Sequence, residues 1–78
     1  MKVWFVVFEQ RDENGNVCNY CICGTYDTYT KAKEKQGMYT YKWRRADRKI
    51  LYIGKDVAVS VCKNNIRSVI YVEEREVK

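Results

Sequence analysis

The feature that most constrains the fold is the dipeptide Asn14-Gly15, which lies between two runs of strand-forming residues. An Asn-Gly pair in that setting is the strongest short-range signal of a β-hairpin. The run before it, Lys2–Glu9, is apolar on both faces and predicts a central strand covered on both sides. The run after it, Val17–Cys23, predicts the return strand. The chain is therefore expected to begin with an antiparallel pair of strands.

The next segment changes character and predicts one short helix. Asp27 or Thr28 is a suitable N-cap for a helix over roughly Thr30–Gln36, and Gly37 suits its C-terminal stop. Only Ala32 is clearly apolar there, so we expect the helix to be coated with lysine and weakly anchored.

The segment Met38–Ile53, MYTYKWRRADRKILYI, joins more aromatic rings to more positive charges than any other part of the chain. Tyr39, Tyr41 and Trp43 occupy every second position, which predicts a strand with three rings on one face. Ile50–Ile53 is rich in strand formers and predicts a second strand. Together they predict a hairpin with a cationic, aromatic surface.

Ala46-Asp47 would form the centre of that turn, and the basic residues beside it would then face one another in pairs. Like charges directly opposite are unfavourable in the free protein, and an anion lying over the tip would relieve them. The predicted pairs are Arg45 with Arg48 and Arg44 with Lys49.

The alternative interpretation is one helix over Thr28–Ala46. It gains support because Ala-Asp is not the Asn-Gly or Asp-Gly pair that two-residue hairpins prefer. Gly37 in its middle and the alternation of the rings count against it. The residues on one side of such a helix would be Tyr29, Ala32, Tyr39, Trp43 and Ala46.

Two further strands complete the prediction. Val57, Val59 and Val61 form the aliphatic face of one strand, Asn64-Asn65 suits a tight turn, and Ile66–Glu73 is the last strand. The predicted order is β-β-α-β-β-β-β in a single domain, 1–78. The fold class is α+β, mainly antiparallel β: a twisted sheet or small barrel of about five or six strands with one short helix.

Positive charge is concentrated in the middle of the chain. The whole sequence carries +5, but residues 31–55 hold nine basic and two acidic residues, hence +7, and the remaining six basic and eight acidic residues give −2. This asymmetry favours an anionic partner. Basic residues interleaved with rings suit single-stranded nucleic acid, because cations contact phosphates and rings stack on bases. The candidate binding residues are Lys31, Lys35, Tyr39, Tyr41, Lys42, Trp43, Arg44, Arg45, Arg48 and Lys49.

Two functions fit these features. The first is a small non-enzymatic binding protein whose hairpin engages nucleic acid or a nucleic-acid-processing complex. The alternative is a protein-interaction module, such as a small viral or mobile-element inhibitor or accessory protein, that docks the cationic hairpin into an acidic cleft of a host enzyme. Trp43 with Arg44 or Arg45 would then be the anchors, since Trp, Tyr and Arg dominate interface hot spots. An unpaired edge strand would also allow a symmetric homodimer.

The cysteines provide a second alternative, a small zinc-binding domain. Cys18, Cys21 and Cys23 form C-x2-C-x-C and Cys62 is distant, and four thiolates can bind zinc tetrahedrally. The spacing lacks a second C-x2-C pair, and on a regular strand Cys18 points away from the other two. Cysteine as a small buried apolar residue is the simpler interpretation, and we expect no cofactor.

Neither an enzyme nor a membrane protein is expected. The chain has no histidine, so a cysteine or serine nucleophile lacks its ordinary base, and it has no glycine-rich phosphate loop. The carboxylates cluster at Asp12-Glu13 and at the C-terminal end, where solvation is expected. The apolar run Met1–Phe8 is too short for a signal-peptide core or a membrane span. We therefore expect a cytoplasmic protein with reduced cysteines.

Overall fold

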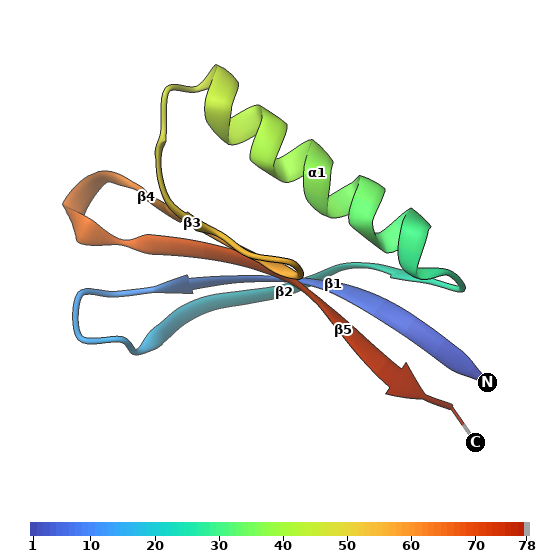
Figure 1. The fold of residues 1–78 in the computed structure, drawn as a ribbon. Helices are drawn as coiled ribbons and strands as arrows, with labels where there is room; N and C mark the ends of the chain where they lie inside the picture. The colour runs from blue at the N-terminus through green and yellow to red at the C-terminus, as the bar shows by residue number, and fades with distance from the viewer. Residues whose placement is uncertain (78) are drawn as a thin grey trace.

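A computed structural model describes residues 1–77, with every side chain among them except that of Lys63. These residues form one five-stranded antiparallel sheet with one long helix across a single face (Figure 1). The strand order in the sheet is β2-β1-β5-β4-β3, so β2 and β3 are the two edges. The elements are β1 (Lys2–Arg11), β2 (Val17–Tyr26), α1 (Tyr29–Arg45), β3 (Lys49–Ile53), β4 (Val57–Val61), the 3-10 turn η1 (Lys63–Asn65) and β5 (Arg67–Glu76).

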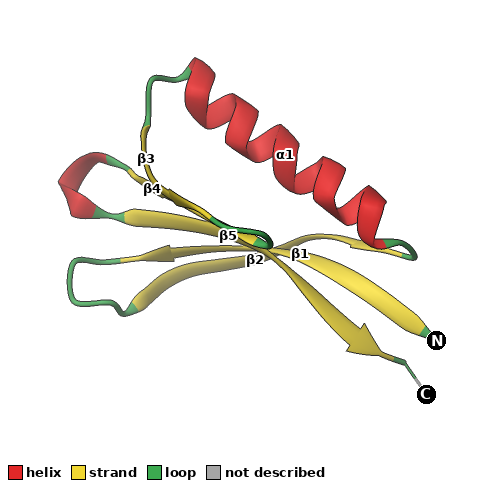
Figure 2. Ribbon diagram, in the orientation of Figure 1, coloured by secondary structure: helices red, strands yellow, loops and turns green. Residues whose placement is uncertain are grey.

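The α+β class and the mainly antiparallel sheet are confirmed, and the sheet is open, not a barrel (Figure 2). The observed order is β-β-α-β-β-β, one strand fewer than the predicted order. β1 lies inside the sheet between β2 and β5, as expected. Its expected cover on both faces is only half present, because α1 covers one face and no other element of residues 1–77 covers the second (Figures 1 and 2).

Two of the tight turns expected from the sequence, at Asn14-Gly15 and Asn64-Asn65, are confirmed. Gly15 has a φ of 83°, and the side chain of Asp12 accepts hydrogen bonds from the backbone N–H groups of Asn14 and Asn16 at 2.9 and 3.0 Å. Asn64-Asn65, before β5, has φ angles of 64° and 58°. These residues supply the left-handed backbone that such turns need.

The hairpin prediction for Met38–Ile53 is wrong in its first half, and the alternative of one long helix is correct. α1 continues through Gly37 to Arg45. Tyr39 and Trp43 are four residues apart, so they share one face of a helix as well as one face of a strand. Only Tyr41 distinguishes the two, and it is 60% exposed while Trp43 is 4% exposed. Burying an indole outweighs the cost of about 1 kcal/mol for a glycine inside a helix.

The predicted turn at Ala46-Asp47 is instead the stop of α1. Asp47 has a φ of 54°, and its N–H donates to the carbonyl of Arg44 at 3.2 Å. The N–H of Arg48 donates to the carbonyl of Trp43 at 3.0 Å. These two bonds and the left-handed residue define a Schellman motif. The predicted cross-strand pairs of Arg45 with Arg48 and of Arg44 with Lys49 are therefore wrong.

The start of the helix follows the sequence, whereas the expected short length does not. Thr28 is the N-cap, and its hydroxyl accepts a hydrogen bond from the N–H of Lys31 at 3.2 Å. The expected stop at Gly37 is wrong, because no motif of helix termination occurs before Ala46. The helix therefore spans 17 residues, or about 25 Å at the usual rise per residue.

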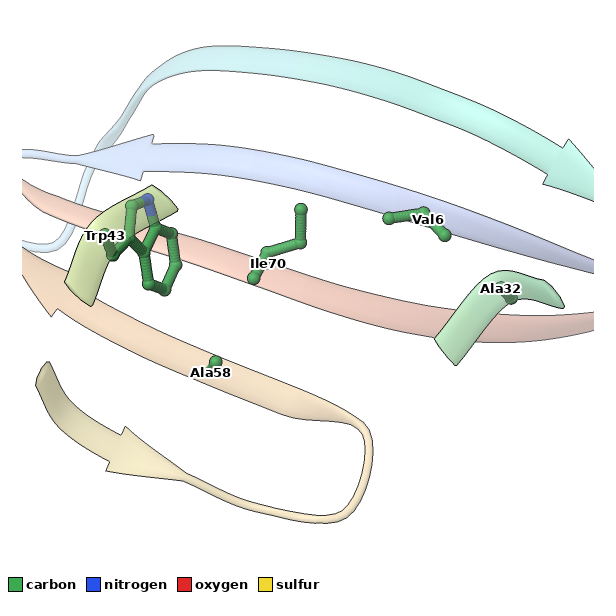
Figure 3. Close-up of a cluster of buried hydrophobic side chains, with 5 residues drawn as sticks. All are labelled: Val6, Ala32, Trp43, Ala58 and Ile70. Atoms are coloured by element: carbon green, nitrogen blue, oxygen red, sulfur yellow. The ribbon is translucent and has the colours of Figure 1, made fainter. Parts of the chain in front are cut away.

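The core lies between α1 and the sheet (Figure 3). Trp43 and Ala32 pack from two ends of the helix onto residues of three neighbouring strands, and the buried amide of Gln36 donates to the carbonyl of Ile70 at 3.1 Å. Because Trp43 is in this cluster, the C-terminal half of α1 is held on the sheet by its bulkiest side chain. The buried cluster consists of Val6, Ala32, Trp43, Ala58 and Ile70.

Candidate cationic binding site

Five exposed basic residues gather where α1 stops and β3 begins, and we call this group the cationic end. Three of them lie in the last turn of α1. The other two are the last residue of the Schellman motif and the first residue of β3. Positive side chains are favourable there because the C-terminus of a helix carries a partial negative charge. The cationic end consists of Lys42, Arg44, Arg45, Arg48 and Lys49.

None of these five residues forms an ion pair with another described side chain. The acidic residues that do form ion pairs lie elsewhere, on β1, on β5 and before α1. The guanidinium and ammonium groups of the cationic end are therefore open to an external anion. The observed ion pairs are Lys2–Glu74 (3.0 Å), Arg11–Glu9 (3.0 Å), Lys31–Asp27 (3.0 Å) and Arg75–Glu73 (3.3 Å).

A shallow pocket of about 290 Å³ lies beside the cationic end. Its lining combines rings from the helix and the sheet with two residues of the cationic end, Lys42 and Arg48. The rings of Phe8 and Tyr39 are stacked, with centroids 6.4 Å apart and planes 22° apart. Such a pocket can receive a planar group between aromatic walls and a positive rim. The other lining residues are Trp43 and Ala46.

Tyr39 lies between two ammonium groups. Nζ of Lys42 is 5.6 Å from its ring centroid and Nζ of Lys35 is 5.8 Å away. Hydrogen bonding to Cys23 and burial raise the pKa of Tyr39 to about 12, so its hydroxyl stays protonated at neutral pH. The ring is thus neutral, and the positive charge around it is not offset by a phenolate.

A second hollow of about 610 Å³ lies on the other side of the helix stop. It shares Ala46 and Arg48 with the aromatic pocket and adds Lys49. Arg48 therefore borders both hollows and can reach a ligand in either. The remaining residues that line it are Gln10, Asp47, Val61, Cys62, Asn64 and Ile66.

The structure brings together four of the ten predicted site residues at the aromatic pocket: Tyr39, Lys42, Trp43 and Arg48. Trp43 is 4% exposed, so it forms a wall of the pocket and belongs mainly to the core. The predicted row of three open rings does not exist, because the helix turns Tyr41 away from the other two.

Of the remaining predicted residues, Arg44, Arg45 and Lys49 belong to the cationic end and the other three have separate positions. Lys31 lies at the N-terminal end of α1 and is paired with Asp27, away from the cationic end. Tyr41 lies under Arg45, whose guanidinium carbon is 5.9 Å from its ring centroid and whose Nη1 donates to its hydroxyl at 3.4 Å. Lys35 contributes only through the ring of Tyr39.

Sequence reasoning missed Phe8, Gln10 and Asn64 as neighbours of the site. A signal for Phe8 was present, because it belongs to the apolar run of the first strand and had to pack on some element. The hairpin prediction removed the helix from that position, and so the partner of Phe8 could not be identified.

The four cysteines are free and are not assembled into a metal site. Among the described residues, no group of three or more His, Cys, Asp or Glu side chains is arranged to hold a metal ion. Sγ of Cys18 donates to the carbonyl of Gln10 at 3.3 Å, and Sγ of Cys62 lies 3.1 Å from Oγ of Ser68. Local hydrogen bonds therefore account for these two thiols.

Comparison of the chain with protein-family models, with curated proteins and with solved structures found no match. No helix in residues 1–77 has the length and apolar character needed to span a bilayer. The cationic end and its two hollows are therefore the features that bear on function.

Proposed function

We propose that this is a small non-enzymatic, cytoplasmic protein that binds nucleic acid through its cationic end. The observation that carries the proposal is a set of five basic side chains that form no ion pair with a described side chain, beside a pocket walled by aromatic rings. Phosphate groups would provide a partner of opposite charge for these side chains, and the aromatic pocket suits a nucleic acid base.

The aromatic pocket favours single-stranded nucleic acid. The pocket is walled by Phe8, Tyr39 and Trp43, and a base must leave its stack to enter such a pocket. Lys42 and Arg48 at the rim lie where the phosphates on either side of that base would pass. Half-buried Lys35, one turn before Tyr39, extends the positive surface toward the middle of α1 and would lengthen the path of the backbone beyond one nucleotide.

The test is a gel-shift titration with single- and double-stranded DNA and RNA at about 50 and 200 mM salt. We expect single strands to bind, and the affinity to fall steeply with salt because each neutralised phosphate releases counterions. The absence of any shift at the lower salt concentration would eliminate the proposal.

A matched pair of variants locates the site. The Lys42→Ala/Arg48→Ala protein is expected to lose about tenfold in affinity, because both phosphate contacts are removed. The Lys2→Ala/Lys55→Ala protein has the same net charge as the first variant and is expected to bind like the wild type. Equal losses in the two proteins would mean that only overall charge matters.

The aromatic wall is tested separately. Tyr39→Leu keeps an apolar side chain against Phe8 and removes the stacking ring. We expect a loss of about 1–3 kcal/mol in single-strand binding with an unchanged salt slope. Unchanged affinity would mean that the ring does not stack on a base and would assign Tyr39 to the fold alone.

A second candidate function, docking into an acidic cleft of a larger protein, is favoured by the burial of Trp43. With Trp43 in the core and Tyr41 the one widely exposed ring among the predicted site residues, a projecting cationic end fits a protein cleft as well as a nucleic acid. Arg44 and Arg45 would be the anchors in that case.

A pull-down from the source cell separates the two functions. The bait is the wild-type chain, with nuclease treatment to remove nucleic acid bridges. The matched variant carries Glu at Arg44, Arg45, Arg48 and Lys49. We expect a protein partner, if it exists, to be captured by the wild type alone, since like charges repel across the interface. Equal capture by the variant would remove the cationic end from this function.

A further inference from the structure

The face of the sheet away from α1 carries two neighbouring rows of mainly apolar side chains. The strand register places Ile22, Val7, Tyr71 and Val57 side by side across four strands. In an antiparallel sheet with one solvated face, each strand normally alternates apolar and polar residues, so the solvated face is polar. The face away from α1 is mainly apolar instead. We call it the open face, because no element of residues 1–77 covers it (Figures 1 and 2). The second row consists of Tyr20, Glu9, Val69, Val59 and Tyr52.

Glu9 is the one ionisable acid in these two rows, and its carboxylate is already satisfied. The hydroxyl of Tyr71 donates to Oε1 at 3.1 Å, and Nε and Nη2 of Arg11 donate to Oε2 at 3.2 and 3.0 Å. The residue is 9% exposed. A carboxylate that is paired and hydrogen-bonded can be covered by another layer without leaving an unpaired buried charge.

The charges near the two apolar rows of the open face are paired. Arg11 pairs with Glu9, and Arg75 pairs with Glu73 while its guanidinium carbon lies 5.3 Å from the ring centroid of Phe5. Arg67 and Lys49 lie at one end of the face, on either side of Val61 in the register, and form no ion pair with a described side chain. The two apolar rows themselves do not need a partner of opposite charge and can meet the same rows of a second copy.

The dimensions of the molecule leave room for a dimer interface. Its two larger extents are 41 and 26 Å, which bounds any one face at about 1,000 Å² in projection, and a standard interface buries about 800 Å² per partner. Two sheets that pack face to face lie about 10 Å apart with interdigitated side chains. The two copies of α1 would then lie on the outer surfaces, where their charges are far apart.

Edge-to-edge pairing is less suited to this sheet. The edge strand β2 has irregular register with β1 at two places, between Val6 and Val7 and between Gln10 and Arg11. The other edge, β3, has five residues and a register shift between Ile50 and Tyr52. Bulges of this kind bend an edge and interrupt the row of backbone groups that a further strand would need.

We propose that the open face is the interface of a symmetric homodimer, in which the two apolar rows of each sheet pack face to face and the helix-borne residues of both cationic ends remain exposed. The second copy is the occupant that this apolar face fits best, since a two-fold interface uses the same patch on both subunits. This interface is independent of the ligand of the cationic end.

The experiment is sedimentation equilibrium of the full chain over about 1–200 µM, a range that covers typical weak and moderate dimers. We expect a mass of twice 9.3 kDa at the upper end of the range. A single 9.3 kDa species at every concentration would overturn the proposal.

Two variants of equal exposure distinguish the open face from the helix side. Ile22→Lys lies on the open face at 51% exposure, and Met38→Lys lies on the outer side of α1 at 52% exposure. We expect the first to raise the dimer dissociation constant by about tenfold or more and the second to leave it unchanged, because a buried lysine without a partner opposes association. Equal effects would contradict the proposal.

A third variant distinguishes face packing from edge pairing. Val59 lies on the interior strand β4 and faces the same side as Val69. Val59→Lys is expected to dissociate the face-packed dimer, with circular dichroism and a thermal melt confirming that the monomer is folded. A Val59→Lys protein that remains a dimer while Ile22→Lys does not would assign association to the β2 edge and overturn the proposal.

Discussion

The two faces of the sheet resemble one another in polarity and differ in what covers them. On one face, Val6 and Ile70 are buried beneath α1. On the other, Val7 is 1% exposed although no element of residues 1–77 lies over it. Its neighbours Ile22 and Tyr71 shield it from the sides, but they remain at the surface themselves. Both faces of the sheet therefore carry mainly apolar side chains, and among residues 1–77 only α1 covers one of them.

Charge divides in the same way. On the helix side, the cationic end holds five basic residues without ion pairs to described side chains, and on the open face Arg11 and Arg75 pair with Glu9 and Glu73. Unpaired positive charges favour an anionic partner, whereas an apolar face with internal ion pairs favours contact with another apolar surface. The two sides of one small domain are therefore suited to different classes of partner.

The largest expected effect tests whether the helix side is the energetic core. Trp43→Ala removes a ring that is 4% exposed beneath α1 and is expected to lower the free energy of unfolding by about 3–5 kcal/mol. The control is Tyr52→Ala on the open face, where the ring is 57% exposed and the expected loss at low protein concentration is below about 1 kcal/mol. Urea denaturation measures both, and similar losses would remove the energetic difference between the faces.

A smaller effect is expected for the hydrogen bond at the centre of the open face. Tyr71→Phe removes the donor to Glu9 and leaves the carboxylate with Arg11 alone. A hydrogen bond to a charged group contributes about 1.5–3 kcal/mol, so we expect a loss toward the lower end of that range in denaturation at pH 7. An unchanged midpoint would mean that water replaces the hydroxyl and that the open face is wet.

The same substitution has a pH dependence with a defined sign. Burial and the hydrogen bond to Glu9 raise the pKa of Tyr71 to about 12, above the usual value of 10.0 for tyrosine. The folded state holds this proton more tightly, so the contribution to stability is complete below about pH 10 and disappears as the pH rises toward 12. Thermal melts should therefore show the gap between wild type and Tyr71→Phe narrowing from pH 10 upward. Tyr39 is present in both proteins and affects both equally, and a constant gap would contradict the assignment.

Local patterns predicted most of the sheet, and the helix boundary shows where they fail. Asn14-Gly15, the alternating valines of β4 and Asn64-Asn65 each carry their own turn or strand chemistry, and all were found as expected. The length of α1 depends on Trp43, whose place in the core is set by contacts with strands that come later in the chain. No local signal contains that information, so Tyr39 and Trp43 fitted both periodicities.

The candidate site was predicted in part for the same reason. The concentration of charge in Lys42–Lys49 is a property of the sequence and survives the change from hairpin to helix end. The pocket is not such a property, because Phe8 reaches it from β1 across the sheet. The Schellman stop at Asp47 also went unrecognised, since the usual glycine is absent from that left-handed position.

The smallest expected effect concerns the residue that argued against the helix. Gly37 lies inside α1 with a φ outside the left-handed region, and an added Cβ would meet no atom within 4 Å. Gly37→Ala should therefore raise the free energy of unfolding by about 0.5–1 kcal/mol, because alanine loses less backbone entropy and is the better helix former. Gly15→Ala is the matched control and should destabilise, since that glycine has a φ of 83°. Were Gly37→Ala to destabilise while the far-ultraviolet spectrum stayed unchanged, the added methyl group would be meeting a neighbour, and the unhindered helical position assigned to Gly37 would be wrong.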